Sequence, residues 1–423
     1  MVVIHWFMSI ALVVTIAPSL WAQSAQVEKD YDKVRVSLLT LGSFDRLYSG
    51  AGHSVLRIND QNSGDDRVYN WGIFNFDSEN FALKFYKETL MYKLVIKKSD
   101  WYINIYKQQG QRGLEEREIL LNPHQKKILL SKVKWWSRKE NRLYRYHIFK
   151  KNCATVIRDL IDESMGGDLK KKTESVKGEY SVRQYWRQYF SSFPFPSLGA
   201  DLLFNSEVDV PLNGWEQMYL PERLQHHLAD QGLLGSSKII IDRPFRQPEG
   251  INPYVLVSII LGAPLVLGWL LFRSTKFRKL GIATIGLGTV VWGLITTAFG
   301  LLIPLTTILS ERTYFYFSAN SWLFWPVDLV LVICGALYWL RGKPIPEKSR
   351  FVKGLRWAAR LHVVGGGIFG VLWLFGVIEQ NIVSEILTIA PLTLCYWLST
   401  LRLVETKPVG SAGGKQPKLQ KSA

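Results

Sequence analysis

From residue 254 to residue 401 the sequence consists largely of apolar stretches that are separated by short polar loops. Five stretches are about 20 residues long, which is the length that an α-helix needs to cross the hydrocarbon core of a bilayer. They cover residues 254–272, 280–303, 322–340, 357–377 and 382–401. This pattern predicts an all-α membrane domain of five spans over residues 254–402.

The distribution of charge gives this domain an orientation. The chain has 52 Lys and Arg against 35 Asp and Glu, a net charge of +17, and in a soluble protein such an excess would favour a nucleic-acid partner. Here Lys and Arg follow the first, third and fifth spans, which all end on one side, and the positive-inside rule makes that side cytoplasmic. We therefore expect no nucleic-acid partner, and we expect residues 25–250 to lie outside the cytoplasm.

The two ends of the chain have compositions of their own. Residues 1–24 form an apolar stretch followed by Pro18 and by small residues near Ala22, as in a secretory signal peptide. They contain His5 but no Lys or Arg, so an uncleaved N-terminal anchor is the alternative. Residues 403–423 are rich in Gly and Lys and are expected to form a disordered cytoplasmic tail.

The exported part has the alternating and periodic patterns of a mixed fold. Strand patterns cover residues 33–41, 53–59, 67–76 and 144–149, and helix patterns cover residues 79–90, 123–139 and 154–164. Asn122, which stands before Pro123, is a suitable N-cap for the second helix. Because strands and helices follow one another in no regular βαβ order, the predicted class is α+β.

Cys153 is the candidate nucleophile of the exported part. The chain has three cysteines, and Cys334 and Cys395 fall within the membrane spans, so Cys153 has no partner for a disulfide within its domain. It lies at the start of a predicted helix and follows Lys150 and Lys151, a setting that lowers the pKa of a thiol. The alternative interpretation is a small buried apolar residue at a helix start.

A cysteine nucleophile needs an imidazole base, and His53 is the best candidate. It follows Gly50-Ala51-Gly52 and opens a predicted strand, which would fix its side chain. Asn70, on the neighbouring strand, could orient its ring, and His147 is the alternative base because it precedes Cys153 by six residues. The other exported histidines, His124, His226 and His227, are expected on the surface. No spacing indicates a metal ligand set, and we expect neither a metal nor a cofactor.

Two groups of polar residues are candidates for binding substrate. Lys150 and Lys151 could contact the phosphate of a lipid headgroup. Asp328, within the third span, together with Glu311 and Asn320 in the preceding outer loop, could border a substrate groove because polar groups are costly in lipid. Hydrogen bonds between helices are the alternative for Asp328 and the expected role of His362.

The order of these residues resembles known enzymes. A histidine on a strand that precedes an Asn-Cys pair at a helix start resembles the circularly permuted papain-like enzymes, such as the lecithin:retinol acyltransferase group. A closer resemblance, to the Lnb family of lipoprotein N-acyltransferases, is carried by residues 52–57 (GHSVLR), 68–76 (VYNWGIFNF), 144–147 (YRYH) and 152–155 (NCAT). That family has a periplasmic papain-like domain followed by a membrane domain.

The resemblance implies a function and a location. Cys153 would carry a fatty acyl chain from a membrane lipid as a thioester, and His53 would act as base, until the α-amine of the N-terminal cysteine of a diacylglyceryl lipoprotein takes the chain. The protein would be a multi-pass protein of the bacterial inner membrane with its catalytic domain, residues 25–250, in the periplasm. Two alternatives remain: a Cys-His amidohydrolase or peptidase of the cell wall, and a non-enzymatic membrane assembly factor.

Overall fold

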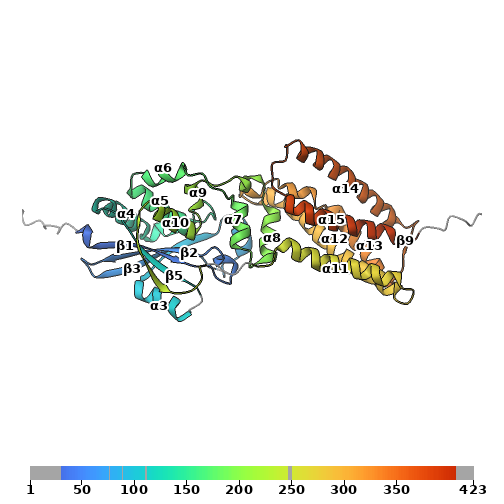
Figure 1. Ribbon diagram of the computed structural model, residues 1–423, viewed down its shortest axis with the longest axis horizontal. Helices are drawn as coiled ribbons and strands as arrows, with labels where there is room; N and C mark the ends of the chain where they lie inside the picture. Colours follow the sequence, from blue (N-terminus) through green and yellow to red (C-terminus); the bar gives the residue numbers. More distant parts are fainter. Residues whose placement is uncertain (1–29, 76, 88, 110–111, 246–249, 406–423) are drawn as a thin grey trace, which may run out of the picture.

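The computed structural model describes residues 30–75, 77–87, 89–109, 112–245 and 250–405. The predicted signal peptide, and the tail beyond residue 405, lie outside these ranges. Figure 1 shows two halves placed end to end: a sheet flanked by helices, and a bundle of long helices. The exported part therefore has mixed α and β structure with an antiparallel sheet, and the C-terminal part is helical, as the sequence predicts.

A seven-stranded antiparallel sheet is the centre of the first half, with strand order β6-β4-β3-β2-β1-β5-β7. Its strands are β1 (Val34–Leu41), β2 (His53–Asp60), β3 (Asp65–Ile73), β4 (Met91–Lys98), β5 (Leu114–Ile119), β6 (Leu143–Arg145) and β7 (Leu234–Ile241). The first three predicted strands are confirmed. β6 is shorter than predicted, because the chain turns after Arg145 and pairs His147 with Lys151.

Helices cover both faces of this sheet. They are α2 (Phe81–Tyr86), α3 (Ser99–Gln109), α4 (Pro123–Trp136), α5 (Cys153–Ser164), α6 (Asp168–Glu174), α7 (Val182–Tyr189), α8 (Pro194–Leu203), α9 (Gly214–Gln217) and α10 (Pro221–Asp230). In Figure 1, α4, α5 and α10 lie over one face and α3 lies under the other. Ile157 and Ile161 of α5 are fully buried in the larger core, so α5 is held firmly against the sheet. Asn122 caps α4 as predicted.

The 3₁₀ helices and the short strands complete the list of elements. They are η1 (Tyr31–Lys33), η2 (Leu47–Ser49), η3 (Lys139–Asn141), η4 (Ser206–Asp209), η5 (Thr313–Phe315), η6 (Ala319–Trp322), η7 (Pro326–Asp328), β8 (Ile345–Pro346) and β9 (Val404–Glu405). The strands β8 and β9 pair in parallel beside the ends of α13 and α15. Three of the 3₁₀ helices lie in the loop that follows the second membrane helix, and that loop bears on the site.

The membrane half has four helices that are long and apolar enough to cross a bilayer, counted over the described residues. They are α11 (Pro253–Arg273), α12 (Arg278–Leu309), α14 (Arg350–Leu374) and α15 (Val383–Arg402). The third predicted span is not one helix, because α13 (Leu329–Arg341) begins only after a break. The two parts, residues 313–322 and 326–341, are bent by 51° and make a fifth span only if they are taken together. Pro326 explains the break, since proline disfavours a helical residue before it.

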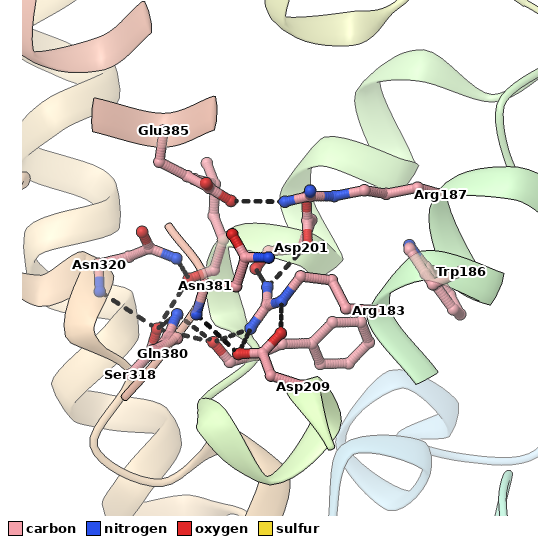
Figure 2. A network of polar contacts seen from close by, with 12 residues as sticks. Arg183, Trp186, Arg187, Asp201, Asp209, Ser318, Asn320, Gln380, Asn381 and Glu385 are labelled. Atoms are coloured by element: carbon pink, nitrogen blue, oxygen red, sulfur yellow. Dashed lines mark hydrogen bonds and ion pairs between the residues drawn. The ribbon is translucent and has the colours of Figure 1, made fainter. Parts of the chain in front are cut away.

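A buried polar network joins the two halves (Figure 2). Arg183 of α7, whose side chain is 1% exposed, lies 2.7 Å from Asp201 of α8 and 2.6 Å from Asp209. Arg187, one turn later, bridges Asp201 at 2.8 Å to Glu385 of the membrane helix α15 at 3.1 Å. The ion pair that crosses between the halves therefore joins Arg187, whose side chain is 29% exposed, to the fully buried Glu385.

The backbone takes part in the same junction. The side-chain nitrogen of Gln380 donates a hydrogen bond to the backbone carbonyl of Phe204 at 2.8 Å, and its side-chain oxygen accepts one from the backbone amide of Ala319 at 2.7 Å. Asn205 donates to the carbonyls of Thr313 and Tyr316, at 2.8 Å each. These contacts fix the loop after α12 against the exported half.

Candidate active site

Cys153 is the first residue of α5, and the start of this helix is tightly fixed. The side-chain oxygen of Asn152 accepts hydrogen bonds from the amides of Ala154 and Thr155 at 2.9 Å each. The amide of Asn152 donates to the hydroxyl of Thr155 at 2.8 Å, which completes a capping box. Asn152 also donates to the carbonyls of Ile148 and Tyr219. The thiol therefore stands on a rigid support at a helix N-terminus, and its residue is only 9% exposed.

His53 opens β2 and lies beside Asn70 of β3. Its Nε2 is 2.7 Å from Asn70 Oδ1, and the amide nitrogen of Asn70 donates to the Tyr102 hydroxyl at 3.3 Å. The bond to Tyr102 turns the Asn70 oxygen toward His53, so Nε2 carries the proton and Nδ1 is the nitrogen that can accept one. The ring of His53 is thus held in the orientation that a base for a neighbouring thiol requires.

The side chains of Cys153 and His53 lie close together. Gly72 lies against both: a Cβ at this position would be 3.7 Å from Cys153 Cβ and 3.8 Å from His53 Cε1. Its φ of +93° falls where the β3–β4 register shifts, between Asn70 and Ile73. Bulges of this kind redirect side chains, and here the bulge lies directly after Asn70.

Opposing effects determine the pKa of the Cys153 thiol. Burial alone would raise it, because the thiolate is poorly solvated. The charge and hydrogen bond of His53, and the backbone amides of Ser54 and Ala154, stabilise the thiolate and bring the pKa below its usual value. The surroundings of Cys153 are therefore those of a reactive thiol.

These groups open into an apolar cavity of about 470 Å³. Cys153, His53 and Gly72 line it at one place, and aromatic side chains form most of its wall. Six of them are Phe74, Phe85, Tyr92, Tyr146, Phe149 and Phe204. Tyr314 and Phe315, from the loop after α12, complete the wall. The cavity is thus built by both halves of the chain, and its lining suits a hydrocarbon chain.

A comparison with known families agrees with this geometry. A family model described as the Lnb N-terminal periplasmic domain matches residues 22–190. This part of the chain is therefore similar to the periplasmic domain of the Lnb family. This confirms the resemblance that the sequence motifs indicate, and the matched residues include Cys153, His53 and Asn70. No curated protein and no solved structure matches the chain. Together with the apolar helices that follow, this similarity fits a membrane protein with a periplasmic domain.

Arg312, which is not among the predicted site residues, also lines this cavity. It is 4% exposed and donates to the carbonyl of Phe85 at 2.8 Å and to the hydroxyl of Tyr314 at 2.5 Å. Its guanidinium carbon lies 4.7 Å from the centre of the Phe85 ring. The signal in the sequence is an Arg followed by aromatic residues in an outer loop, on the side where Lys and Arg are scarce.

His147, the alternative base, is placed differently from His53. Its Nδ1 accepts hydrogen bonds from the amides of Phe149 and Lys150 at 3.1 Å each. Burial, followed by the positive charges of Lys150 and Arg312, lowers its pKa to about 4. At neutral pH His147 is therefore uncharged, and its Nδ1 stabilises the turn that leads from the edge strand β6 into α5.

The other predicted binding residues lie outside the described lining of this cavity. Lys150 is exposed, and Lys151 places its ammonium 5.7 Å from the centre of the Trp136 ring. Glu311 lies 3.6 Å from Arg145 at the surface. Asn320 donates to the carbonyl of Leu202 at 2.9 Å, within the junction of the two halves. Asp328 is buried in the membrane half, 3.2 Å from His362 Nε2.

The remaining histidines of the exported half differ in exposure. His124 and His226 are exposed, as expected, but His227 is buried, so the prediction of a surface position is wrong for this residue. The reason is helix geometry, since His227 lies on the inner face of α10 beside Leu224 and Leu228 and 3.1 Å from Gln217. His226, His227 and Asp230 bring ligand atoms within 4.8 Å of one another, and His226 pairs with Asp230 at 2.9 Å.

Removing His53 is expected to slow the reaction of Cys153 with an alkylating reagent. In the native protein the lowered pKa gives more thiolate at pH 7, so the alkylation rate should level off at a lower pH than for free cysteine. In His53→Ala, burial is opposed only by the two amides, so the pKa rises and the rate at pH 7 falls roughly 10-fold. Iodoacetamide labelling of the Cys153 peptide, followed by mass spectrometry across pH, measures this effect.

The exposed His124 provides the matched control for this measurement. His124→Ala also removes an imidazole from the Lnb domain, but it lies at the exposed start of α4 and should leave the labelling profile unchanged. An identical pH profile for native protein and His53→Ala would contradict the role given to His53.

Proposed function

We propose that this protein is a cysteine-dependent acyltransferase that moves a fatty acyl chain from a membrane lipid to the α-amine of the N-terminal cysteine of a bacterial lipoprotein. The observation that carries the proposal is the position of the Cys153, His53 and Asn70 group at the wall of an aromatic cavity. The membrane half closes that cavity. Substrates of both steps are lipids anchored in the bilayer, so a tethered site meets them at high effective concentration.

The first step forms a thioester. His53 Nδ1 takes the proton of the Cys153 thiol, and the thiolate attacks the carbonyl carbon of a lipid ester. The oxygen that becomes negative is stabilised by amides at the start of α5, where the amide of Cys153 has no intrahelical acceptor. The carbon–oxygen bond then breaks, His53 returns its proton to the departing alkoxide, and a lysolipid leaves. Asn70 holds the imidazole through Nε2 and stabilises its charged form.

The second step forms the amide. The α-amine of a diacylglyceryl cysteine attacks the thioester carbonyl, and His53 Nδ1 accepts a proton from the amine nitrogen. The carbon–sulfur bond breaks, and the thiolate of Cys153 is restored. No external oxidant, reductant or metal enters either step, because both are nucleophilic substitutions at one carbonyl carbon.

The lining of the cavity favours this function over cleavage of the cell wall. Muropeptides and glycans are polar and require many hydrogen-bonding groups around them. The described walls instead consist mainly of Phe, Tyr and Trp side chains with a few aliphatic residues. An apolar site also excludes water, which would otherwise hydrolyse the thioester before the amine arrives.

The proposed function includes a location. We place the protein in the bacterial inner membrane as a multi-pass protein, with residues 25–250 as the periplasmic Cys-His domain and residues 254–402 as the membrane domain. The broken helix of residues 313–341 counts as the third of five spans. This arrangement puts the cavity at the outer surface of the membrane, where lipoprotein precursors present their N-terminal cysteine.

Intact mass spectrometry of the full-length protein tests the proposal. Incubation with a diester lipid should add the mass of one acyl chain, and peptide mapping should place it on Cys153. Addition of a synthetic peptide with an N-terminal diacylglyceryl cysteine should then remove the adduct and produce an N-acylated peptide. An adduct that disappears only by hydrolysis would contradict the transfer, and a protein that forms no adduct would contradict the thioester.

A further inference from the structure

The cavity that contains Cys153 reaches the surface of the exported half at η2 and α2. Leu47 and Tyr48 of η2 and Phe85 of α2 line this cavity. The same three residues are exposed at the surface, by 43%, 58% and 38%. Leu83, two positions before Phe85, is 47% exposed. These four large aliphatic and aromatic side chains, which we call the rim, thus border the mouth of the cavity.

Ring contacts connect the two elements that carry the rim. Phe74, which directly follows β3, lies edge-on to Tyr48 with 6.2 Å between the ring centres. Phe74 also stacks on Phe81 at 5.8 Å, and Phe81 stacks on Phe85 at 6.3 Å. All four rings belong to the lining of the cavity. The rim is therefore the outer margin of the same aromatic wall that lies beside Cys153.

The rim lies next to one end of a membrane helix. The side chain of Arg312 donates a hydrogen bond to the backbone carbonyl of Phe85 at 2.8 Å, and Arg312 follows the end of α12 at Leu309 by three residues. Ile308, in the last turn of α12, is 77% exposed. The exposed apolar surface of α12, a candidate membrane span, therefore ends close to the helix that carries Leu83 and Phe85.

This position favours a lipid bilayer as the body that the rim contacts. Exposed groups of large apolar side chains mark surfaces that bind protein or lipid. Here the hydrocarbon layer around α12 ends beside α2, so the rim is held at the surface of the bilayer by the chain itself. Leu83 and Phe85 also flank Lys84, and apolar side chains beside a cation are typical of helices that lie in a membrane interface.

We propose that the rim inserts into the adjacent leaflet of the bilayer, and that acyl chains of membrane lipids enter the cavity across it. An acyl chain then passes from the hydrocarbon layer to the aromatic wall without crossing water, where each methylene would be exposed at a cost in free energy. Insertion of the rim is independent of the chemistry at Cys153. The use of the rim as the entry for substrate rests on the proposed function.

Fluorescence quenching tests the insertion. Leu47→Cys and Leu83→Cys are made in full-length protein that also carries Cys153→Ala and Cys395→Ala, so that the one native cysteine left is the buried Cys334. Each variant is labelled with an environment-sensitive fluorophore and reconstituted into vesicles of dioleoyl phosphatidylethanolamine and phosphatidylglycerol. Lipids with a nitroxide on the acyl chain should lower the emission at both positions roughly twofold or more, because the label lies within the leaflet.

Leu120 provides the matched control, because it is an equally exposed leucine, at 50%, of the same half. Leu41 of β1 pairs both with His53 and with Leu114, the first residue of β5. Leu120 follows the last residue of β5, so it lies at the end of the sheet away from His53 and from the rim. The label in Leu120→Cys should therefore keep its emission when the nitroxide lipids are added.

A second measurement tests the entry of substrate. Leu83→Glu places a carboxylate in the rim, and the rate at which Cys153 acquires an oleoyl group from the vesicles, followed by intact mass, should fall roughly 10-fold. Alkylation of Cys153 by iodoacetamide, a small reagent that dissolves in water, should change by less than about twofold, which also shows that the variant is folded. Leu120→Glu should leave both rates unchanged.

The outcomes separate the inference from the function. Quenching at positions 47 and 83 but not at 120, with slower acylation and unchanged alkylation in Leu83→Glu, supports both parts of the inference. Absence of quenching at 47 and 83 overturns the insertion and leaves a protein partner as the occupant of the rim. Unchanged acylation in Leu83→Glu overturns the entry route and leaves the acyltransferase proposal standing. A native protein that acquires no oleoyl group overturns the proposed function and the entry route, while quenching still decides the insertion.

Discussion

Replacing Cys153 by Ala is expected to abolish transfer of the acyl chain, with a loss of about 10⁵- to 10⁶-fold, as for other enzymes that lose a covalent nucleophile. No other described residue of the cavity has a thiol, and the amides at the start of α5 cannot form a thioester. In a strain that depends on this variant, mass spectra of lipoprotein N-terminal peptides should lack the amide-linked chain. Purified Cys153→Ala should acquire no acyl mass from a diester lipid.

Cys395→Ala is the matched control, because it also exchanges a cysteine for alanine. Cys395 is exposed on the membrane helix α15, far from the aromatic cavity in sequence and outside its described lining, so N-acylation should persist. Lipoproteins that keep their amide-linked chain with Cys153→Ala would contradict the acyltransferase proposal. Loss of muropeptide cleavage in the same strain would instead favour the cell-wall hydrolase, and the absence of any effect would favour the assembly factor.

Replacing Arg183 by Met is expected to lower the free energy of unfolding of the protein strongly. Arg183 is 1% exposed and lies between Asp201, 2% exposed, and Asp209, 12% exposed. It also donates to the carbonyls of Asp201 and Asn205. Its removal takes away the arginine that pairs with Asp209 and leaves Asp201 with Arg187 alone. Breaking one side of such a buried pair costs about 3–5 kcal/mol. The apparent melting temperature of the full-length protein, followed by tryptophan fluorescence, should fall by roughly 10 °C.

An exposed arginine provides the comparison for this prediction. Arg35 pairs with Glu118 at 3.1 Å, but its side chain is 60% exposed, and exposed pairs of this kind contribute little. Arg35→Met should therefore melt close to the native protein. If Arg183→Met and Arg35→Met melted at the same temperature, the network of Figure 2 would not hold the two halves together as its burial indicates.

The parts of the site that the sequence predicts well are those with local signals. Asn152 and Cys153 stand at a helix start that composition identifies, and His53 follows a glycine-rich turn and opens a strand. Pairing of β2 with β3 then brings His53 within reach of Asn70, which lies diagonally across the two strands. The contact from His53 to Cys153 spans one hundred positions, and only the packing of α5 on the sheet establishes it.

The parts that the sequence does not predict depend on the junction of the two halves. Asp328, within the third span, and Asn320, in the loop before it, are predicted to border a substrate groove. In the structure Asp328 lies beside His362, and Asn320 donates to the carbonyl of Leu202. The sequence predicts no function for Arg312, because arginine is common in surface loops. Its burial arises only when Phe85 and Tyr314 close around it. Likewise, the break before α13 follows from Pro326, which hydropathy alone does not register.

The contribution of the loop after α12 to the cavity has a consequence for when the thiol becomes usable. A periplasmic half without the membrane helices would lack Tyr314 and Phe315, and the cavity would be open to solvent on the side that these two residues line. A thioester formed there would be lost to water instead of reaching an amine. For the proposed acyltransferase, we therefore expect activity only when the membrane helices are inserted and the loop after α12 closes the cavity.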